Sequence, residues 1–100
     1  MKVAFDIDDT LMKVRSADGV PVPDYDLIQV LRWFAQNGDD VIVWSGGGVS
    51  YAEMIVRRLG IEHLVTVTAK GSLRADICFD DMNAEGLATV PVQVRLHRIK

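Results

Sequence analysis

Short apolar runs alternate with amphipathic stretches along the chain. Each run has the length and apolar content of a strand buried in a parallel sheet. We expect four such strands, at residues 2–6, 41–44, 64–67 and 77–79. Alternating apolar residues from Val90 to Leu96 predict a fifth strand. Pro91 places this strand at the edge of the sheet, because proline donates no backbone hydrogen bond.

Two amphipathic helices are predicted between the first three strands. In the first, apolar residues recur at helical spacing over residues 27–35, with Asp24 as the cap and Gly38 as the stop. In the second, the apolar face spans residues 51–59 and the helix ends at Gly60.

The order of strands and helices predicts an α/β fold in a single domain, residues 1–100. Strands that alternate with helices imply right-handed crossovers and a mainly parallel sheet of about five strands. We therefore expect a Rossmann-like three-layer sandwich with strand 2–6 at its centre and helices on both faces. Residues 13–23, which contain two prolines and an Asp-Gly pair, suit a turn or short hairpin. At this chain length there is no room for a cap domain.

Composition and charge narrow the functional class. A net charge of -3 argues against general attraction to nucleic acids or membranes, whose phosphates favour basic proteins. No apolar run approaches membrane-spanning length, and the early acids Asp6, Asp8 and Asp9 do not fit a secretory signal. The single cysteine, Cys78, forms no internal disulfide. We expect a cytoplasmic protein without a membrane partner.

Polar side chains stand where three of the predicted strands end. Asp6 and Asp8 follow the first strand, Ser45 and three glycines follow the second, and Asp80 and Asp81 close the fourth. Because the carboxyl ends of parallel strands share one edge of a sheet, these groups are expected in one cleft. Four acids there would repel one another and any bound phosphate, and a divalent cation with oxygen ligands, such as Mg²⁺, would relieve this repulsion.

In this order the motifs resemble those of the haloacid dehalogenase superfamily of phosphohydrolases, over almost the whole chain. The first family motif, D-x-D-x-T, matches residues 6–10. The second, a Ser or Thr after an apolar strand, matches Ser45, and the fourth, a pair of acids, matches Asp80–Asp81. The third motif is a Lys or Arg, for which Lys70 and Arg74 both remain candidates, with Lys70 favoured.

The resemblance implies a magnesium-dependent phosphatase acting on phosphomonoesters. Asp6 would attack phosphorus and form a phosphoaspartyl intermediate, and Asp8 would act as general acid and then general base. The implied catalytic residues are Asp6, Asp8, Ser45 and Lys70. The implied phosphate-binding residues are Ser45, Gly46, Gly47, Lys70 and Arg74. The implied metal ligands are Asp6, Asp8 through its backbone carbonyl, Asp80 and Asp81.

Several alternatives concern the substrate and the activity itself. An acid at Asp8 favours a phosphatase or a phosphomutase over the dehalogenases and transport ATPases of the superfamily. Mutases of the superfamily usually carry a cap domain, for which this chain has no space. Without a cap the site should be open, which leaves a nucleotide, a nucleic-acid end or a phosphoprotein as substrate, and a homo-oligomer could cover the site. The alternative function is a catalytically inactive phosphate- or metal-binding or regulatory module on the same scaffold.

Overall fold

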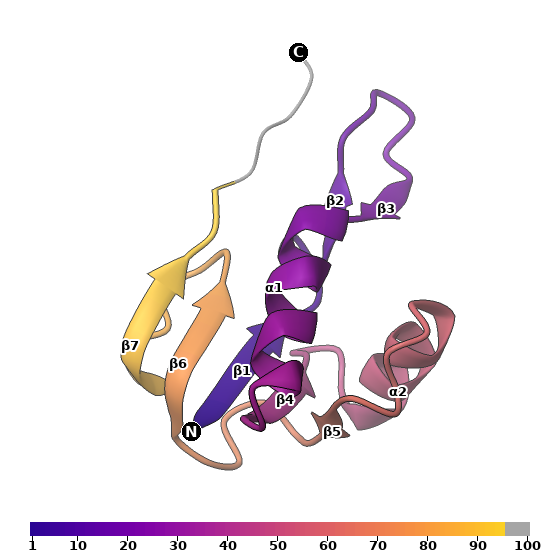
Figure 1. Cartoon of the computed structure of the whole chain (residues 1–100). Helices are drawn as coiled ribbons and strands as arrows, with labels where there is room; N and C mark the ends of the chain where they lie inside the picture. The colour runs from indigo at the N-terminus through magenta and orange to yellow at the C-terminus, as the bar shows by residue number, and fades with distance from the viewer. Residues whose placement is uncertain (96–100) are drawn as a thin grey trace.

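The computed structural model describes residues 1–95 and contains a five-stranded parallel sheet (Figure 1). The strands lie in the order β5-β4-β1-β6-β7. They span β1 (Lys2–Asp6), β4 (Asp40–Trp44), β5 (Thr66–Val67), β6 (Ala75–Asp80) and β7 (Ala88–Gln93). The predicted α/β class is confirmed, with β1 central and β7 at an edge. Leu96, which was expected in the last strand, lies outside the described residues.

Both helices pack on the same face of the sheet. Helix α1 spans Tyr25–Gln36, and its cap is Asp24, whose Oδ1 accepts a hydrogen bond from the Leu27 amide at 3.1 Å. Helix α2 spans Val49–Arg58. One buried cluster joins the sheet to both helices; its members include Val3, Phe5, Val41, Val43, Ile28, Leu31, Ala52, Ile55 and Val56. Within the described residues neither helix is long and apolar enough to cross a membrane.

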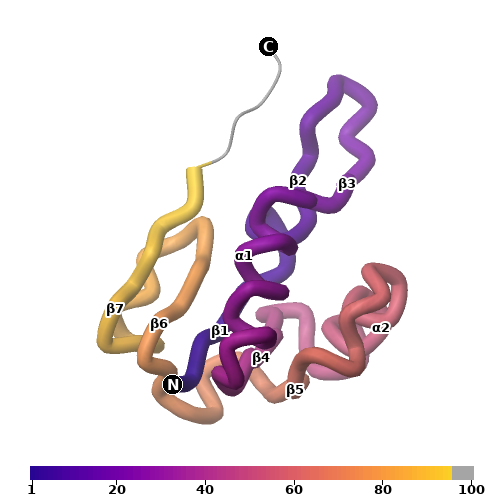
Figure 2. Tube along the Cα trace, viewed as in Figure 1, coloured from indigo at the N-terminus to yellow at the C-terminus, as the bar shows by residue number. Residues whose placement is uncertain are grey.

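The opposite face of the sheet is covered by loops, so the expectation of helices on both faces is wrong. Ala4, Ile42 and Trp44 form a second core there. Its cover comes from residues 68–74 and 81–87, the connections on either side of β6, through Leu73, Ala84 and Leu87. Figure 2 traces both connections. The steps from β1 to β4 and from β4 to β5 run in one direction, so right-handed crossovers place both helices on one face.

A β-hairpin fills the predicted turn region after β1. Its strands, β2 (Met12–Val14) and β3 (Pro21–Pro23), pair antiparallel. The hairpin extends beyond the carboxyl end of β1 (Figure 1). Its base is tied to α1 by two cations, because Lys13 Nζ lies 2.6 Å and Arg15 Nη2 3.2 Å from Asp24 Oδ2. Lys13 and Asp24 are both buried, so each depends on the other for neutralisation.

Asp24 should stabilise the fold in two ways that can be measured separately, through its ion pairs with Lys13 and Arg15 and through its role as the helix cap. Asp24→Asn keeps a good helix cap but leaves the Lys13 ammonium buried beside a neutral group, so the free energy of unfolding should fall by about 3 kcal/mol. Asp24→Ala removes the cap as well and should cost about 1 kcal/mol more. Urea unfolding measures both, with the exposed Asp26→Asn as the matched control. Equal stability of Asp24→Asn and Asp26→Asn would show that the ion pair contributes nothing.

Candidate active site

The loop after β1 supports a buried carboxylate at the end of the central strand. Asp6 is the last residue of β1 and is 5% exposed. Asp9 adopts a left-handed φ of 62°, a conformation that Asp tolerates better than most residues. This turn brings the Thr10 amide back to the Ile7 carbonyl at 3.1 Å. Thr10 Oγ1 then donates a hydrogen bond to Asp6 Oδ2 at 3.3 Å, so the loop orients the carboxylate.

A second buried carboxylate lies beside the first and shares a lysine with it. Asp80 ends β6, which pairs directly with β1, and Asp80 Oδ1 accepts a hydrogen bond from the Met82 amide at 3.0 Å. Lys70 Nζ lies 2.8 Å from Asp80 Oδ2 and 3.2 Å from Asp6 Oδ1. The lysine therefore bridges the two strand ends from the loop that follows β5.

Of the two basic candidates, the structure brings only Lys70 to the acids. Arg74 immediately precedes β6, at the opposite end of the strand from Asp80. The six residues of β6 separate the two ends by roughly 20 Å. The Arg74 guanidinium donates instead to the carbonyl of Ala88 at 3.1 Å. Arg74 thus connects β6 to the start of β7.

Three carboxylates converge to form a cluster that consists of Asp6, Asp80 and Asp81. One oxygen from each lies within 4.8 Å of the others. Burial raises the pKa of Asp6, and the charge of Asp80 raises it further. Burial, a hydrogen bond with Asp80 and the neighbouring charges raise the pKa of Asp81 to about 6. Burial alone would lower the pKa of Lys70, but its contacts with Asp80 and Asp6 outweigh this and raise it, so the lysine stays charged.

Ser45 and the glycines after it form a tight turn beside the carboxylate cluster. Asp6 pairs with Trp44 in the sheet register, so Ser45 follows at the same edge, where it is 3% exposed. Its Oγ accepts a hydrogen bond from the Gly47 amide at 3.0 Å. Gly48 caps α2 with a φ of 101°, a value that favours glycine. The turn therefore places the Ser45 hydroxyl and backbone amides next to the N-terminus of α2. Such a position suits the binding of phosphate oxygens.

Asp8 stands apart from the carboxylate cluster and has a partner that the sequence did not reveal. Its side chain is exposed, and its Oδ1 accepts a hydrogen bond from the Tyr51 hydroxyl at 2.6 Å. The helical spacing predicts Tyr51 only on the apolar face of the second helix. Burial, the hydrogen bond with Asp8 and nearby acidic charge raise the pKa of Tyr51 to about 12, so it remains a donor. A phenol in the first turn after a Ser-Gly-rich loop is the signal that could have identified it.

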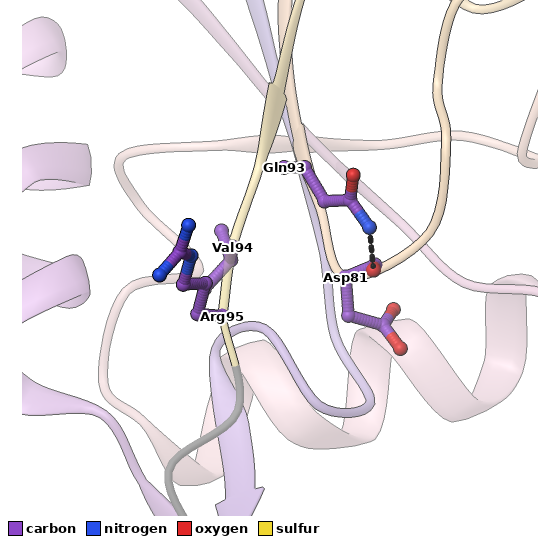
Figure 3. Close-up of a pocket in the computed structure, with 4 residues that line it drawn as sticks. All are labelled: Asp81, Gln93, Val94 and Arg95. Carbon is purple, nitrogen blue, oxygen red and sulfur yellow. Dashed lines mark hydrogen bonds between the residues drawn. The ribbon is translucent and has the colours of Figure 1, made fainter.

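A pocket opens next to the carboxylate cluster at the ends of β6 and β7. It has a volume of about 530 Å³ and is lined by Asp81, Gln93, Val94 and Arg95. Gln93 Nε2 donates a hydrogen bond to the Asp81 carbonyl at 3.2 Å (Figure 3). Asp81 is the one member of the carboxylate cluster that lines this pocket.

Comparisons of the chain with protein-family models, with curated proteins and with solved structures found no match.

The raised pKa of Asp81 predicts that the metal-free protein loses stability as the pH rises. Between about pH 4 and pH 7 the carboxyl of Asp81 binds a proton more readily in the folded protein than in the unfolded chain. The contribution of this proton to the free energy of unfolding is therefore lost as the pH rises and the carboxyl ionises. In EDTA, the free energy of unfolding of the wild type should fall across this range relative to that of Asp81→Asn. Chemical denaturation measures the difference. Parallel curves for the two proteins would contradict the shift.

Proposed function

We propose that the chain is a magnesium-dependent phosphomonoester hydrolase of the haloacid dehalogenase type that forms a phosphoaspartyl intermediate on Asp6. The observation that carries the proposal is the setting of this carboxylate. It is buried at the end of the central strand, accepts a hydrogen bond from Thr10 and contacts the ammonium group of Lys70. The helix cap Asp24 is also buried and paired with cations, but Asp6 differs because it shares its one lysine with a second buried carboxylate, Asp80, at the carboxyl end of the neighbouring strand.

The proposed reaction has two steps. In the first, an Asp6 oxygen attacks phosphorus, the bond from phosphorus to the leaving oxygen breaks, and Asp8 donates a proton to that oxygen. In the second, Asp8 accepts a proton from water as the water oxygen attacks phosphorus. The bond between phosphorus and Asp6 then breaks, which releases phosphate and restores both carboxyl groups. The exposed position of Asp8 suits a group that must reach both a leaving group and solvent.

The phosphate itself would be bound by groups that surround Asp6. Lys70 places a positive charge 3.2 Å from the attacking carboxylate. The Ser45 hydroxyl lies at the same sheet edge and can donate to a phosphate oxygen. The backbone amide of Gly46 adds a donor near the start of α2, whereas the amide of Gly47 already donates to Ser45 Oγ. Together these groups would stabilise negative charge that shifts between the phosphate oxygens during transfer.

The carboxylate cluster fits a magnesium ion in donor type and in charge. Asp6, Asp80 and Asp81 each contribute an oxygen within 4.8 Å of the others, and Mg²⁺ prefers oxygen ligands. With all three acids ionised, the single charge of Lys70 leaves two negative charges, which a divalent ion neutralises. Asp8 would contribute its backbone carbonyl, since its carboxyl is directed to Tyr51. When bound, the ion would screen the nucleophile from the anionic substrate.

The range of substrates that we propose rests on the absence of a covering domain between β1 and α1 in the described part of the chain. The β2–β3 hairpin is the only insertion between β1 and α1 in the described part of the chain, so the site lacks a covering domain there. Nucleotides, nucleic-acid ends and phosphoproteins all suit such an open site, and a second copy of the chain could cover it. A cytoplasmic location is consistent with Cys78, a buried thiol whose pKa burial raises to about 11, which makes it unreactive.

The direct test is hydrolysis of p-nitrophenyl phosphate with Mg²⁺. Turnover should disappear in EDTA and return when Mg²⁺ is added in excess. Asp6→Asn should lower kcat by at least about a thousand-fold, because the amide is not a nucleophile. The exposed Asp26→Asn serves as the control and should retain full activity. Wild-type protein inactive on this ester, on nucleotides and on end-phosphorylated oligonucleotides would favour the inactive binding module instead.

The two basic residues should differ sharply in their effect on this activity. Lys70→Ala removes the cation beside Asp6 and should lower kcat about 100-fold. Arg74→Ala, at the far end of β6, should leave kcat within about threefold of wild type, with at most a small loss of stability. Steady-state kinetics and thermal melts of both variants provide the comparison. If Arg74→Ala loses more kcat than Lys70→Ala, the basic residue of the third motif is Arg74 and not Lys70.

A further inference from the structure

Tyr51 makes a contact with Asp8 that helix packing alone does not require. Its hydroxyl donates to Asp8 Oδ1 at 2.6 Å across 43 positions of sequence. The tyrosine lies in the first turn of α2, next to Ala52, which is fully buried in the main core. Asp8 lies in the exposed loop after β1. A side chain from an anchored helix thus reaches over to a carboxylate on a loop.

The turn of Ser45, Gly46 and Gly47 also lies against the Tyr51 ring. A Cβ atom added at Gly47 would lie 3.1 Å from Tyr51 Cδ2 and 3.3 Å from Ser45 Oγ. The ring therefore packs closely against the turn at Gly47, where a Cβ atom would be in tighter contact than usual. With its backbone fixed by α2 and its ring fixed by the turn, the hydroxyl has little freedom to move away from Asp8.

We propose that Tyr51 is the positioning residue for the acid–base group of this site, holding Asp8 Oδ1 so that Oδ2 exchanges the proton. This inference rests on the function proposed above. Tyr51 keeps its own proton throughout. Oδ2 of Asp8 gives a proton to the leaving oxygen in the first step and takes one from water in the second. An exposed aspartate without this hydrogen bond would sample several side-chain orientations, of which few suit proton transfer.

The role predicts a dependence on the leaving group that a purely structural role would not produce. p-Nitrophenolate leaves readily without a proton, whereas phenolate and alkoxides need one. Loss of a well-placed acid should therefore matter little for p-nitrophenyl phosphate and increasingly for phenyl phosphate and glycerol 2-phosphate. The ratio kcat/KM is the right quantity, because it reports the steps up to the first irreversible release.

The test compares Tyr51→Phe with wild type on these three esters. We expect kcat/KM to fall less than about threefold for p-nitrophenyl phosphate and at least about tenfold for glycerol 2-phosphate. Tyr25→Phe, which changes a tyrosine that is 71% exposed, should behave as wild type on all three. In an Asp8→Asn background, Tyr51→Phe should have no further effect, because the two residues act as one unit. Thermal melts establish that each variant is folded.

The outcomes separate this inference from the proposed function. If Asp8→Asn shows the leaving-group dependence but Tyr51→Phe loses the same factor on every ester, Tyr51 has only a structural role and the inference is wrong. An additive loss in the double variant also overturns it. If the wild type hydrolyses none of the esters, or if Asp8→Asn is as active as wild type, the proposed function fails and the role of Tyr51 fails with it.

Discussion

Asp6 and Asp80 end neighbouring strands with buried carboxylates, and Lys70 lies between them, 3.2 and 2.8 Å from their oxygens. Two such charges side by side would destabilise the fold if they were left without compensation. The parallel pairing of β1 with β6 brings them together, and the lysine offsets part of the repulsion. Burial and the remaining negative charge raise the pKa values of Asp6 and Asp81. The chemistry proposed for the site depends on this contact.

The same segment that provides the lysine also completes the fold. Residues 68–74 leave β5 at one side of the sheet and reach the start of β6 beyond β1. Near its beginning this segment carries Lys70 to the acids, and further on Leu73 covers the second core. A loop in place of a helix therefore serves both purposes in a short chain.

Local pattern was sufficient to predict the strands, the helix cap at Asp24 and the residues that gather at the sheet edge. Three features depended on the arrangement of the chain in space, which a local pattern does not contain. Arg74 is closer than Lys70 to the acid pair in sequence, but the length of β6 separates it from them. The placement of both helices on one face follows from the direction of successive crossovers. Tyr51 has helical apolar spacing, and its polar role appears only when its partner Asp8 is known.

The central claim is that Asp6 becomes phosphorylated during turnover, and borohydride trapping tests it most directly. An acyl phosphate is reduced by borohydride to the alcohol, whereas a free carboxylate is not. Protein quenched during steady-state hydrolysis and then reduced should contain homoserine at position 6 in peptide mass spectra, and protein without substrate should not. Turnover with an unmodified Asp6, or homoserine at another aspartate, would contradict the account.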